Sequence, residues 1–512
     1  MAGRSTEPRI TRRRLIGTGA GAAAGLALGG VPGALAKRRS GHRHPDRHLQ
    51  RANVVVVGAG FAGLTAARNV VHADRSVIVL EARKRVGGRA FNHKLSNGVI
   101  SEGGATFAGP TQNRILRLAK RMGVETFPTF DEGDNVYISV DGSRLTYSDT
   151  GITGTAPPDP QVLPDLATII IGPNGVDELS KSVPVDAPWK APRAAEWDRQ
   201  SFQQYVDSQP LVNPREFKPV VSAATRPIFG AEPDELSLLF VLFYVAASGN
   251  EKNPGTFERN FNTRDGAQMW RFRGGSQLIA ERQAKRLGHR LMLGSPVRRI
   301  EQVRGSVRVI SDRVEVAAKR VIVAVPPEVA GFIRYDPKLP QARAKLNRRL
   351  HQGALIKATA VYREPFWRDA GLNGSALAPG GPVEFTYDDS PPSGRPGIVF
   401  GFIGGDNARA HRMLGKAARR RAVLENFVQF FGSEASSPTD YFETDWSTSQ
   451  WTRGCPVGIA APGVYTAYGP ALRKPVGRIH WAGTETSTFW NGYMDGAVRS
   501  GERAADEVLK RL

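Results

Sequence analysis

The chain has 512 residues, with 70 Lys and Arg against 48 Asp and Glu, and 40% of its residues are hydrophobic. A single cysteine excludes an intramolecular disulfide and a thiolate metal site, and the hydrophobic fraction excludes a wholly disordered chain. Residues 1–51 hold 11 Lys and Arg against 2 Asp and Glu, so much of the basic excess lies in an N-terminal tail. Because no nucleic-acid-binding motif follows, we expect no nucleic-acid partner.

The N-terminal segment is typical of an export signal. Arg12 and Arg13 form a twin-arginine pair before an apolar, small-residue stretch that runs to about Leu35. The sequence Ala34-Leu35-Ala36 fits the small-x-small rule for cleavage, which predicts a signal peptide over 1–36 and a basic linker over 37–51. We therefore expect twin-arginine export from a bacterial cytoplasm to the cell envelope or the medium, with no membrane anchor in the mature form. An ordinary secretory signal is the alternative.

A dinucleotide-binding motif follows the linker. Residues 53–57 predict a strand buried on both faces, residues 58–63 read Gly-Ala-Gly-Phe-Ala-Gly, and residues 64–68 begin a helix. A second strand over 76–80 ends in Glu81, whose carboxylate can accept hydrogen bonds from ribose hydroxyls and repels a 2′-phosphate. Gly58 permits the tight turn, Gly60 a close approach of a pyrophosphate, and Gly63 close helix–strand packing.

Separated segments between residues 53 and 508 resemble the flavin-dependent amine oxidase family, and its monoamine oxidase branch most closely. Besides the glycine motif and the Arg-Lys-Arg-Val-Gly-Gly-Arg stretch at 83–89, the resemblance is carried by residues 103–120, 355–357, 362–367, 475–486 and 490–497. It implies an α/β and α+β fold, in which a Rossmann-like FAD domain of the glutathione-reductase type is interleaved with a mixed-sheet substrate domain. The FAD domain would take 52–128, 272–350 and 453–512, and the substrate domain 129–271 and 351–452.

The resemblance implies FAD as cofactor and oxidation of an amine to an imine, which hydrolyses to an aldehyde or ketone while O₂ is reduced to H₂O₂. It implies these cofactor-binding residues: Gly58, Gly60, Phe61, Ala62, Gly63, Glu81, Arg83, Gly88, Arg89, Gly104, Ala105, Val297, Cys455, Gly483, Thr484, Glu485 and Met494. From the resemblance we expect no metal. We expect a small-molecule amine and O₂ as partners, and a monomer or homodimer.

The family lysine that holds a water against the flavin corresponds to Lys357, and the tyrosine beside the flavin face corresponds to Tyr493. Both are the predicted catalytic residues, and Gln268, Trp490 and Tyr493 are the predicted substrate-binding residues. Pro456 stands where the branch has its second aromatic wall, so the sequence leaves open whether Trp451, Phe489 or Trp490 replaces it.

Cys455 lies at the position where the monoamine oxidase branch attaches its flavin by a thioether, and the sequence leaves the covalent bond and a buried free thiol both open. Glu384, Asp388 and Asp389 offer carboxylates that could hold the distal ammonium of a diamine. A monoamine substrate is favoured. The alternatives are a polyamine, L-amino-acid or cyclic-amine oxidase, a non-amine flavin dehydrogenase or desaturase, and an FAD-binding protein without turnover.

Overall fold

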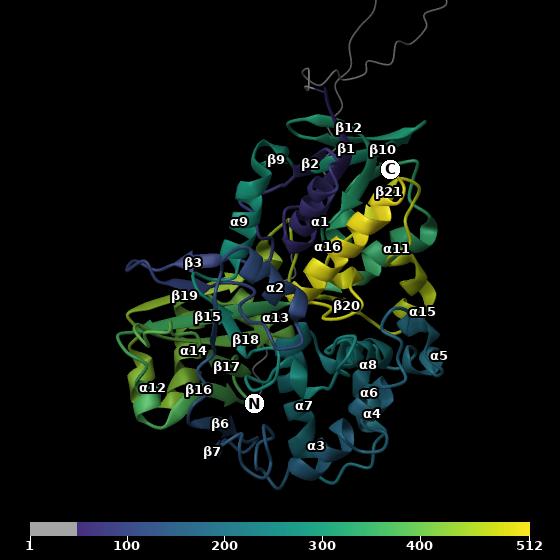
Figure 1. Ribbon diagram of the computed structural model, residues 1–512. Coiled ribbons are helices and arrows are strands. Elements are labelled where there is room, and N and C mark those ends of the chain that lie inside the picture. The colour runs from purple at the N-terminus through teal and green to yellow at the C-terminus, as the bar shows by residue number, and fades with distance from the viewer. Residues whose placement is uncertain (1–48) are drawn as a thin grey trace, which may run out of the picture. The chain divides into compact units, whose positions relative to one another are not determined.

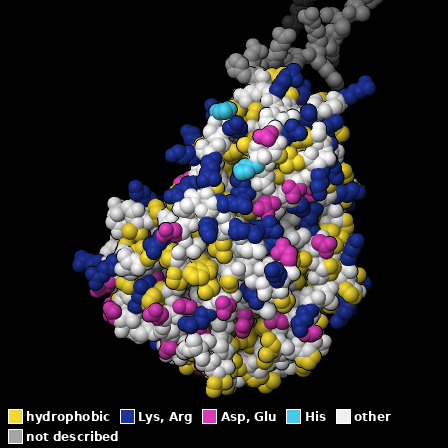
Figure 2. All heavy atoms as spheres, viewed as in Figure 1, with side chains coloured by type: hydrophobic (Ala, Val, Ile, Leu, Met, Phe, Trp, Pro, Cys, Tyr) yellow, Lys and Arg dark blue, Asp and Glu magenta, His cyan; other side chains and the backbone are white. Residues whose placement is uncertain are grey.

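The computed structural model describes residues 49–512, so the predicted signal peptide and nearly all of the basic linker lie outside the described residues. Within residues 49–512, no helix combines the length and apolarity that crossing a membrane would need. Figure 2 shows Lys and Arg side chains spread over much of one face, with Asp and Glu among them.

An eight-stranded sheet is built around the predicted glycine-motif strand. Its order is β13-β10-β11-β12-β1-β2-β9, and β21 also pairs with β12. In the centre β1 runs parallel to β12 and β2, with Val54 to Val57 opposite Val77 to Leu80, and the four valines are buried as expected of a doubly covered strand. The strands are β1 (Leu49–Val57), β2 (Val77–Leu80), β9 (Leu291–Met292), β10 (Val297–Val303), β11 (Ser306–Ser311), β12 (Glu315–Val323), β13 (Arg334–Asp336) and β21 (Ile479–Trp481).

Helix α16 (Met494–Leu509) packs along α1 (Phe61–His72), as Figure 1 shows. The two backbones approach so closely that a Cβ on Gly501 would lie 2.3 Å from the carbonyl oxygen of Ala62. The other helices near this sheet are α2 (Asn113–Arg121), α9 (Gln277–Leu287), α10 (Pro327–Ala330) and α11 (Gln341–Arg349). The contact between α1 and α16 fixes the start of α16, and with it Tyr493, relative to the glycine motif.

A second, seven-stranded sheet has the order β19-β15-β18-β17-β16-β6-β7 and is antiparallel except for the β16–β6 pair. Its central strand β15 is buried at every position and carries Lys357. The strands are β6 (Asp134–Ile138), β7 (Arg144–Tyr147), β15 (Leu355–Tyr362), β16 (Leu372–Leu377), β17 (Phe385–Asp388), β18 (Gly397–Gly404) and β19 (Asp440–Asp445), with helices α12 (Phe366–Asp369), α13 (Gly405–Met413) and α14 (Lys416–Phe431) beside them.

A helical region joins the two sheets and has its own apolar core, in which α8 is buried along nearly its whole length. Its helices are α3 (Leu163–Ile170), α4 (Val176–Ser180), α5 (Ala194–Trp197), α6 (Phe202–Asp207), α7 (Pro214–Phe229), α8 (Leu238–Ala246) and α15 (Val464–Tyr468). Three two-stranded pairs complete the described elements: β3 (Asn92–Lys94) with β4 (Ile100–Glu102), β5 (Thr126–Pro128) with β8 (Trp270–Phe272), and β14 (Leu350–Gln352) with β20 (Gly458–Ala460).

The strands of the first sheet come from 49–80, 291–336 and 479–481, and those of the second from 134–147, 355–404 and 440–445. The chain therefore crosses repeatedly between two sheets, as the α/β and α+β prediction expects. The described residues 49–512 nevertheless lie within one compact unit, so the exact domain boundaries stay a prediction.

Candidate active site

A cavity of about 780 Å³ lies at the carboxyl ends of β1, β2 and β12, where ligands bind in open parallel sheets. Its wall includes Gly58 after β1, Glu81 after β2 and Ala324 after β12, and it continues to Lys357 on the second sheet. Sixteen of the seventeen predicted cofactor residues line it: Gly58, Gly60, Phe61, Ala62, Glu81, Arg83, Gly88, Arg89, Gly104, Ala105, Val297, Cys455, Gly483, Thr484, Glu485 and Met494.

The three glycines of the motif differ in what surrounds them. Gly58 has a φ of +99°, and a Cβ there would lie 2.8 Å from the Ala324 carbonyl oxygen, so both backbone conformation and space require glycine. Gly63 does not line the cavity; a Cβ there would lie 1.9 Å from the Gly58 carbonyl oxygen, which is the predicted close packing of helix on strand. At Gly60 the nearest atom to such a Cβ is 3.9 Å away, so the protein itself leaves this position open.

Glu81 is 5% exposed and its carboxylate organises the motif as well as facing the cavity. Oε2 accepts a hydrogen bond from the backbone N–H of Ala59 at 2.7 Å, and Oε1 accepts one from that of Arg83 at 2.8 Å. A carboxylate has about four acceptor sites, so two are left for the predicted ribose hydroxyls.

Two arginines of the 83–89 stretch hold the cavity wall together. The Arg83 guanidinium donates to the hydroxyls of Ser449 and Thr452 at 2.7 and 2.8 Å. Arg89 pairs with Glu485 Oε1 at 2.8 Å and donates to the Pro456 carbonyl oxygen at 2.7 Å. Glu485 is 2% exposed, and its Oε2 has no partner among the described residues.

These features fit a flavin dinucleotide. Eight glycines line the cavity, so a bulky planar ligand can lie directly against the protein backbone. The N-terminus of α1 opens toward the pyrophosphate position that the motif predicts. The unpartnered Glu485 oxygen can accept a hydrogen bond from a bound ligand. Among residues 49–512, no group of three or more His, Cys, Asp and Glu could hold a metal ion.

Lys357 lies opposite the dinucleotide part of the cavity and is 4% exposed. Its Nζ donates to Thr106 Oγ1 at 2.8 Å and stands 3.6 Å from the centre of the Phe400 ring. Burial lowers the pKa of the Lys357 amine below its ordinary value. Lys357 therefore lies on an inner strand with a buried amine, whereas the lysine of an apolar run more often has its charged end in solvent.

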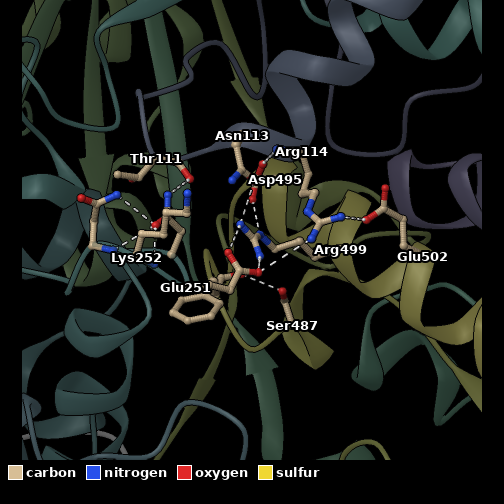
Figure 3. Close-up of polar contacts among 12 residues, drawn as sticks. Thr111, Asn113, Arg114, Glu251, Lys252, Ser487, Asp495, Arg499 and Glu502 are labelled. Atoms are coloured by element: carbon tan, nitrogen blue, oxygen red, sulfur yellow. Dashed lines mark hydrogen bonds and ion pairs between the residues drawn. The ribbon is translucent and has the colours of Figure 1, made fainter.

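Tyr493 lines the cavity and precedes α16, whose first turn is fixed by a polar network (Figure 3). Asp495 accepts from the backbone N–H groups of Arg114 and Ile115 at 2.6 and 2.9 Å, and Arg499 donates to it at 2.5 Å. Because the carboxylate satisfies the start of α2 from the first turn of α16, the two helices hold Tyr493 at a defined place.

The predicted role of Trp490 as a substrate-contacting residue needs correction, because Trp490 does not line the cavity. It is 1% exposed and packs edge-on against Tyr493 with ring centres 4.8 Å apart, so it supports that ring from behind. Phe489 does not line the cavity either, whereas Trp451 does, with the Arg298 guanidinium 5.4 Å from its ring centre.

Sequence reasoning missed Tyr244 on α8, which lines the cavity with its ring centre 5.9 Å from that of Tyr493. The Tyr493 hydroxyl donates to the Asn260 carbonyl oxygen at 3.0 Å. The available signal was a lone hydroxyl in the apolar run 238–246. Gln268 lines the cavity as predicted, and its Nε2 donates to the same Asn260 oxygen at 3.3 Å.

The three carboxylates considered for a distal ammonium do not line the cavity, because each faces a protein partner. Glu384 accepts from Asn407 at 2.7 Å, and Asp388 accepts from Trp367 and Arg368 at 2.9 and 2.8 Å. Asp389 pairs with Arg271 at 2.9 Å. The aromatic residues of the same segment, Phe385 and Tyr387, do line the cavity.

Cys455 lines the cavity beside Pro456 and is 8% exposed. Its Sγ lies 3.7 Å from the Leu355 carbonyl oxygen. Burial raises the pKa of the Cys455 thiol to about 12, while the nearby Arg89 charge acts in the opposite direction. The place of Cys455 on the cavity wall is compatible with both alternatives left by the sequence.

Comparisons with known proteins agree with this site. The profile of the flavin-containing amine oxidoreductase family matches residues 61–509. The chain is 41% identical over 464 residues to a Mycobacterium tuberculosis protein described as a flavin-containing monoamine oxidase, with 90% of this chain and 97% of that one covered. It is 37% identical to flavin-containing amine oxidase B of Homo sapiens, with 90% and 87% covered.

Two solved structures share the fold. A putrescine oxidase bound to putrescine matches with a TM-score of 0.84 and 30% identity, over 91% of this chain and 100% of that one. Cyclohexylamine oxidase from Brevibacterium oxydans IH-35A matches with a TM-score of 0.83 and 33% identity, over 90% and 99%.

Proposed function

The chain belongs to the flavin-containing amine oxidoreductase family and is an FAD-dependent amine oxidase, and from that premise we propose that its substrates are apolar monoamines. The observation that carries the proposal is the wall of the cavity around Lys357 and Tyr493. It is aromatic and neutral, with these side chains: Phe107, Tyr244, Phe257, Phe261, Phe385, Tyr387, Phe402 and Gln268.

When bound, FAD accepts a hydride equivalent from the carbon next to the nitrogen and passes the electrons to O₂. The surrounding chain selects the reactive form of the amine. An apolar wall disfavours a charged ammonium, so it favours the neutral amine, which is the form that can be oxidised. Tyr493, held by Tyr244, Trp490 and Asn260, gives the amine a rigid aromatic surface. Lys357 donates a hydrogen bond to Thr106 at 2.8 Å, and this polar pair lines the same cavity.

The carboxylates on the cavity wall are few among the described residues and support a monoamine. Glu81 and Glu485 belong to the cofactor part, and Asp149 pairs with Arg264 at 3.0 Å. Glu258 is exposed and accepts from the Thr155 hydroxyl at 3.3 Å. Glu258 is thus the one wall carboxylate of this outer part that could hold the second ammonium of a diamine, as a putrescine oxidase would require.

A peroxidase-coupled H₂O₂ assay with purified FAD-loaded protein tests the proposal. We expect kcat/KM for 2-phenylethylamine, benzylamine or cyclohexylamine to exceed that for putrescine by at least about tenfold, which is about 1.4 kcal/mol of transition-state binding. Glu258→Gln should leave the monoamine values unchanged, with Glu132→Gln as a matched acidic control that does not line the cavity. A preference for putrescine that Glu258→Gln abolishes and Glu132→Gln does not would establish the diamine function instead.

We also propose covalent attachment of FAD through Cys455 and twin-arginine export of the folded protein. The first is supported by the position of Cys455 on the cavity wall beside Arg89, and the second by Arg12, Arg13 and the cleavage pattern at 34–36.

A further inference from the structure

Three buried charged side chains form a cluster that includes Glu102, four residues before Thr106, whose hydroxyl accepts a hydrogen bond from Lys357 Nζ at 2.8 Å. The Arg271 guanidinium lies 3.1 Å from Glu102 Oε2 and 2.9 Å from Asp389 Oδ1, and all three residues are at most 3% exposed. They come from three distant parts of the chain: Glu102 from β4, Arg271 from β8 and Asp389 from the end of β17. Such burial is expensive, so the cluster has to be closed by its own partners.

Hydrogen bonds from neighbouring residues hold the cluster in one geometry. The Ser101 hydroxyl donates to Asp389 Oδ2 at 2.6 Å, and Arg271 Nη1 donates to the Ser390 carbonyl oxygen at 2.7 Å. The Phe127 ring centre lies 5.1 Å from the guanidinium carbon. The Arg271 side chain therefore cannot leave one carboxylate without losing a second contact.

The charges of the cluster do not balance without Lys357. Two carboxylates face one guanidinium, and the Lys357 ammonium would make the set neutral. Asp389 and then Glu102 raise the pKa of the Lys357 amine against the larger lowering by burial, whereas Arg271 lowers it. Burial also raises the pKa of Glu102 above its ordinary value.

The other elements packed on this side of β15 bring no further charge. Across the strand pairs, Lys357 lies opposite Phe402 of β18 and Thr444 of β19, and its amine covers the Phe400 ring. Glu443 and Asp445 flank Thr444 on β19 and thus point to the opposite face of the sheet, where they pair with His411 and Arg412. Glu102, Asp389 and Arg271 are therefore the described charges that act on Lys357.

We propose that Glu102 and Asp389, held in place by Arg271, set the charge of the Lys357 amine and are positioning residues for that lysine. The inference rests on the proposed function, because it gives the cluster a task in amine oxidation. Glu102, Asp389 and Arg271 do not line the cavity, and the inference assigns to them the control of the Lys357 amine, which does. Removing either negative charge should make Lys357 lose its proton at a lower pH.

Competitive labelling of the FAD-loaded protein measures this directly. Trace acetic anhydride modifies only the neutral amine, and mass spectrometry of the Lys357 peptide between pH 5 and 10, normalised to exposed Lys285, gives the pH at which Lys357 titrates. In Asp389→Asn we expect this midpoint to fall by about one pH unit, a tenfold change in the ammonium-to-amine ratio at a given pH. Glu102→Gln should shift it in the same direction and less. Glu384→Gln, which changes a buried carboxylate that is not among the charges acting on Lys357, should leave it at the wild-type value.

The pH profile of turnover provides the second readout, because a purely structural cluster would lower the rate without moving the profile. Wild-type midpoints in both folded variants would overturn the inference. If Asp389→Asn does not fold, Glu102→Gln decides, since it keeps the Arg271–Asp389 pair. Labelling needs no turnover, so a wild type without amine oxidation would refute the proposed function and leave the labelling result to stand by itself.

Discussion

Alanine at Gly60 and alanine at Gly63 should separate the two tasks of the glycine motif. The matched pair adds one methyl group at each end of the same turn. A Cβ on Gly60 meets nothing closer than 3.9 Å within the protein, whereas a Cβ on Gly63 would lie 1.9 Å from the Gly58 carbonyl oxygen. We therefore expect Gly60→Ala to disturb the ligand alone and Gly63→Ala to disturb the fold.

The magnitudes follow from these distances. Gly60 is the N-cap of α1 with a φ of −78°, so alanine there costs below about 1 kcal/mol of folding stability. The Gly63 methyl forces α1 away from the strand, which costs about 1–3 kcal/mol or more as an overpacked core does. If the pyrophosphate lies against Gly60, the methyl group added by Gly60→Ala should weaken FAD binding by more than about tenfold, or about 1.4 kcal/mol.

Both variants are made in a Cys455→Ala background, so that FAD can be removed and titrated back. Thermal unfolding of the FAD-free proteins reports the fold, and quenching of flavin fluorescence reports the affinity. Gly60→Ala should keep the parent Tm within about 3 °C, whereas Gly63→Ala should lower it further. Parental FAD affinity in Gly60→Ala would refute the assignment of the pyrophosphate to this backbone.

Three further outcomes are expected. Lys357→Met should keep its bound flavin, seen by absorbance, yet lose about 100-fold in turnover, chiefly in the step with O₂, as removal of a positioned proton-transfer group does; unchanged reoxidation would make Lys357 structural. After acid precipitation, flavin should stay with the wild-type pellet and leave with the supernatant in Cys455→Ala, and full release from the wild type would exclude the thioether. The double variant Arg12→Lys, Arg13→Lys should remain in the cytoplasm as the precursor. Undiminished export would indicate an ordinary secretory signal instead of a twin-arginine signal.

The dinucleotide part of the site could be predicted from the sequence because local chemistry determines it. Gly58, Gly63 and Glu81 belong to one strand–turn–helix–strand unit. The residues near them in the chain determine the conformation or contact that each position requires. The structure adds that Glu81 binds the Ala59 and Arg83 backbones, which fixes the turn itself. The three-dimensional structure of a motif that spans few residues can therefore be predicted from its sequence.

The amine-binding part could not be predicted in the same way, because its residues meet only through tertiary packing. Trp490 lies two residues before the cavity-lining Gly492, yet it is buried in the core against Tyr493. Tyr244 comes from a helix some 250 residues before Tyr493, and it lines the cavity with its ring centre 5.9 Å from that of Tyr493. Whether an aromatic side chain packs or lines a cavity depends on the helix opposite, which no local pattern encodes.

The carboxylates of 384–389 show the same limit for charge. Read along the chain, three acids close together favour a cationic ligand, and in the structure each is bound by a different protein group. Their partners Asn407, Arg368 and Arg271 lie on separate elements, so the sequence cannot tell a free carboxylate from a neutralised one. The one that acts on the chemistry, Asp389, does so through its effect on Lys357 rather than by touching an amine. Charge in this protein therefore controls the reaction from behind the cavity wall, and the wall itself stays apolar enough to select a neutral amine.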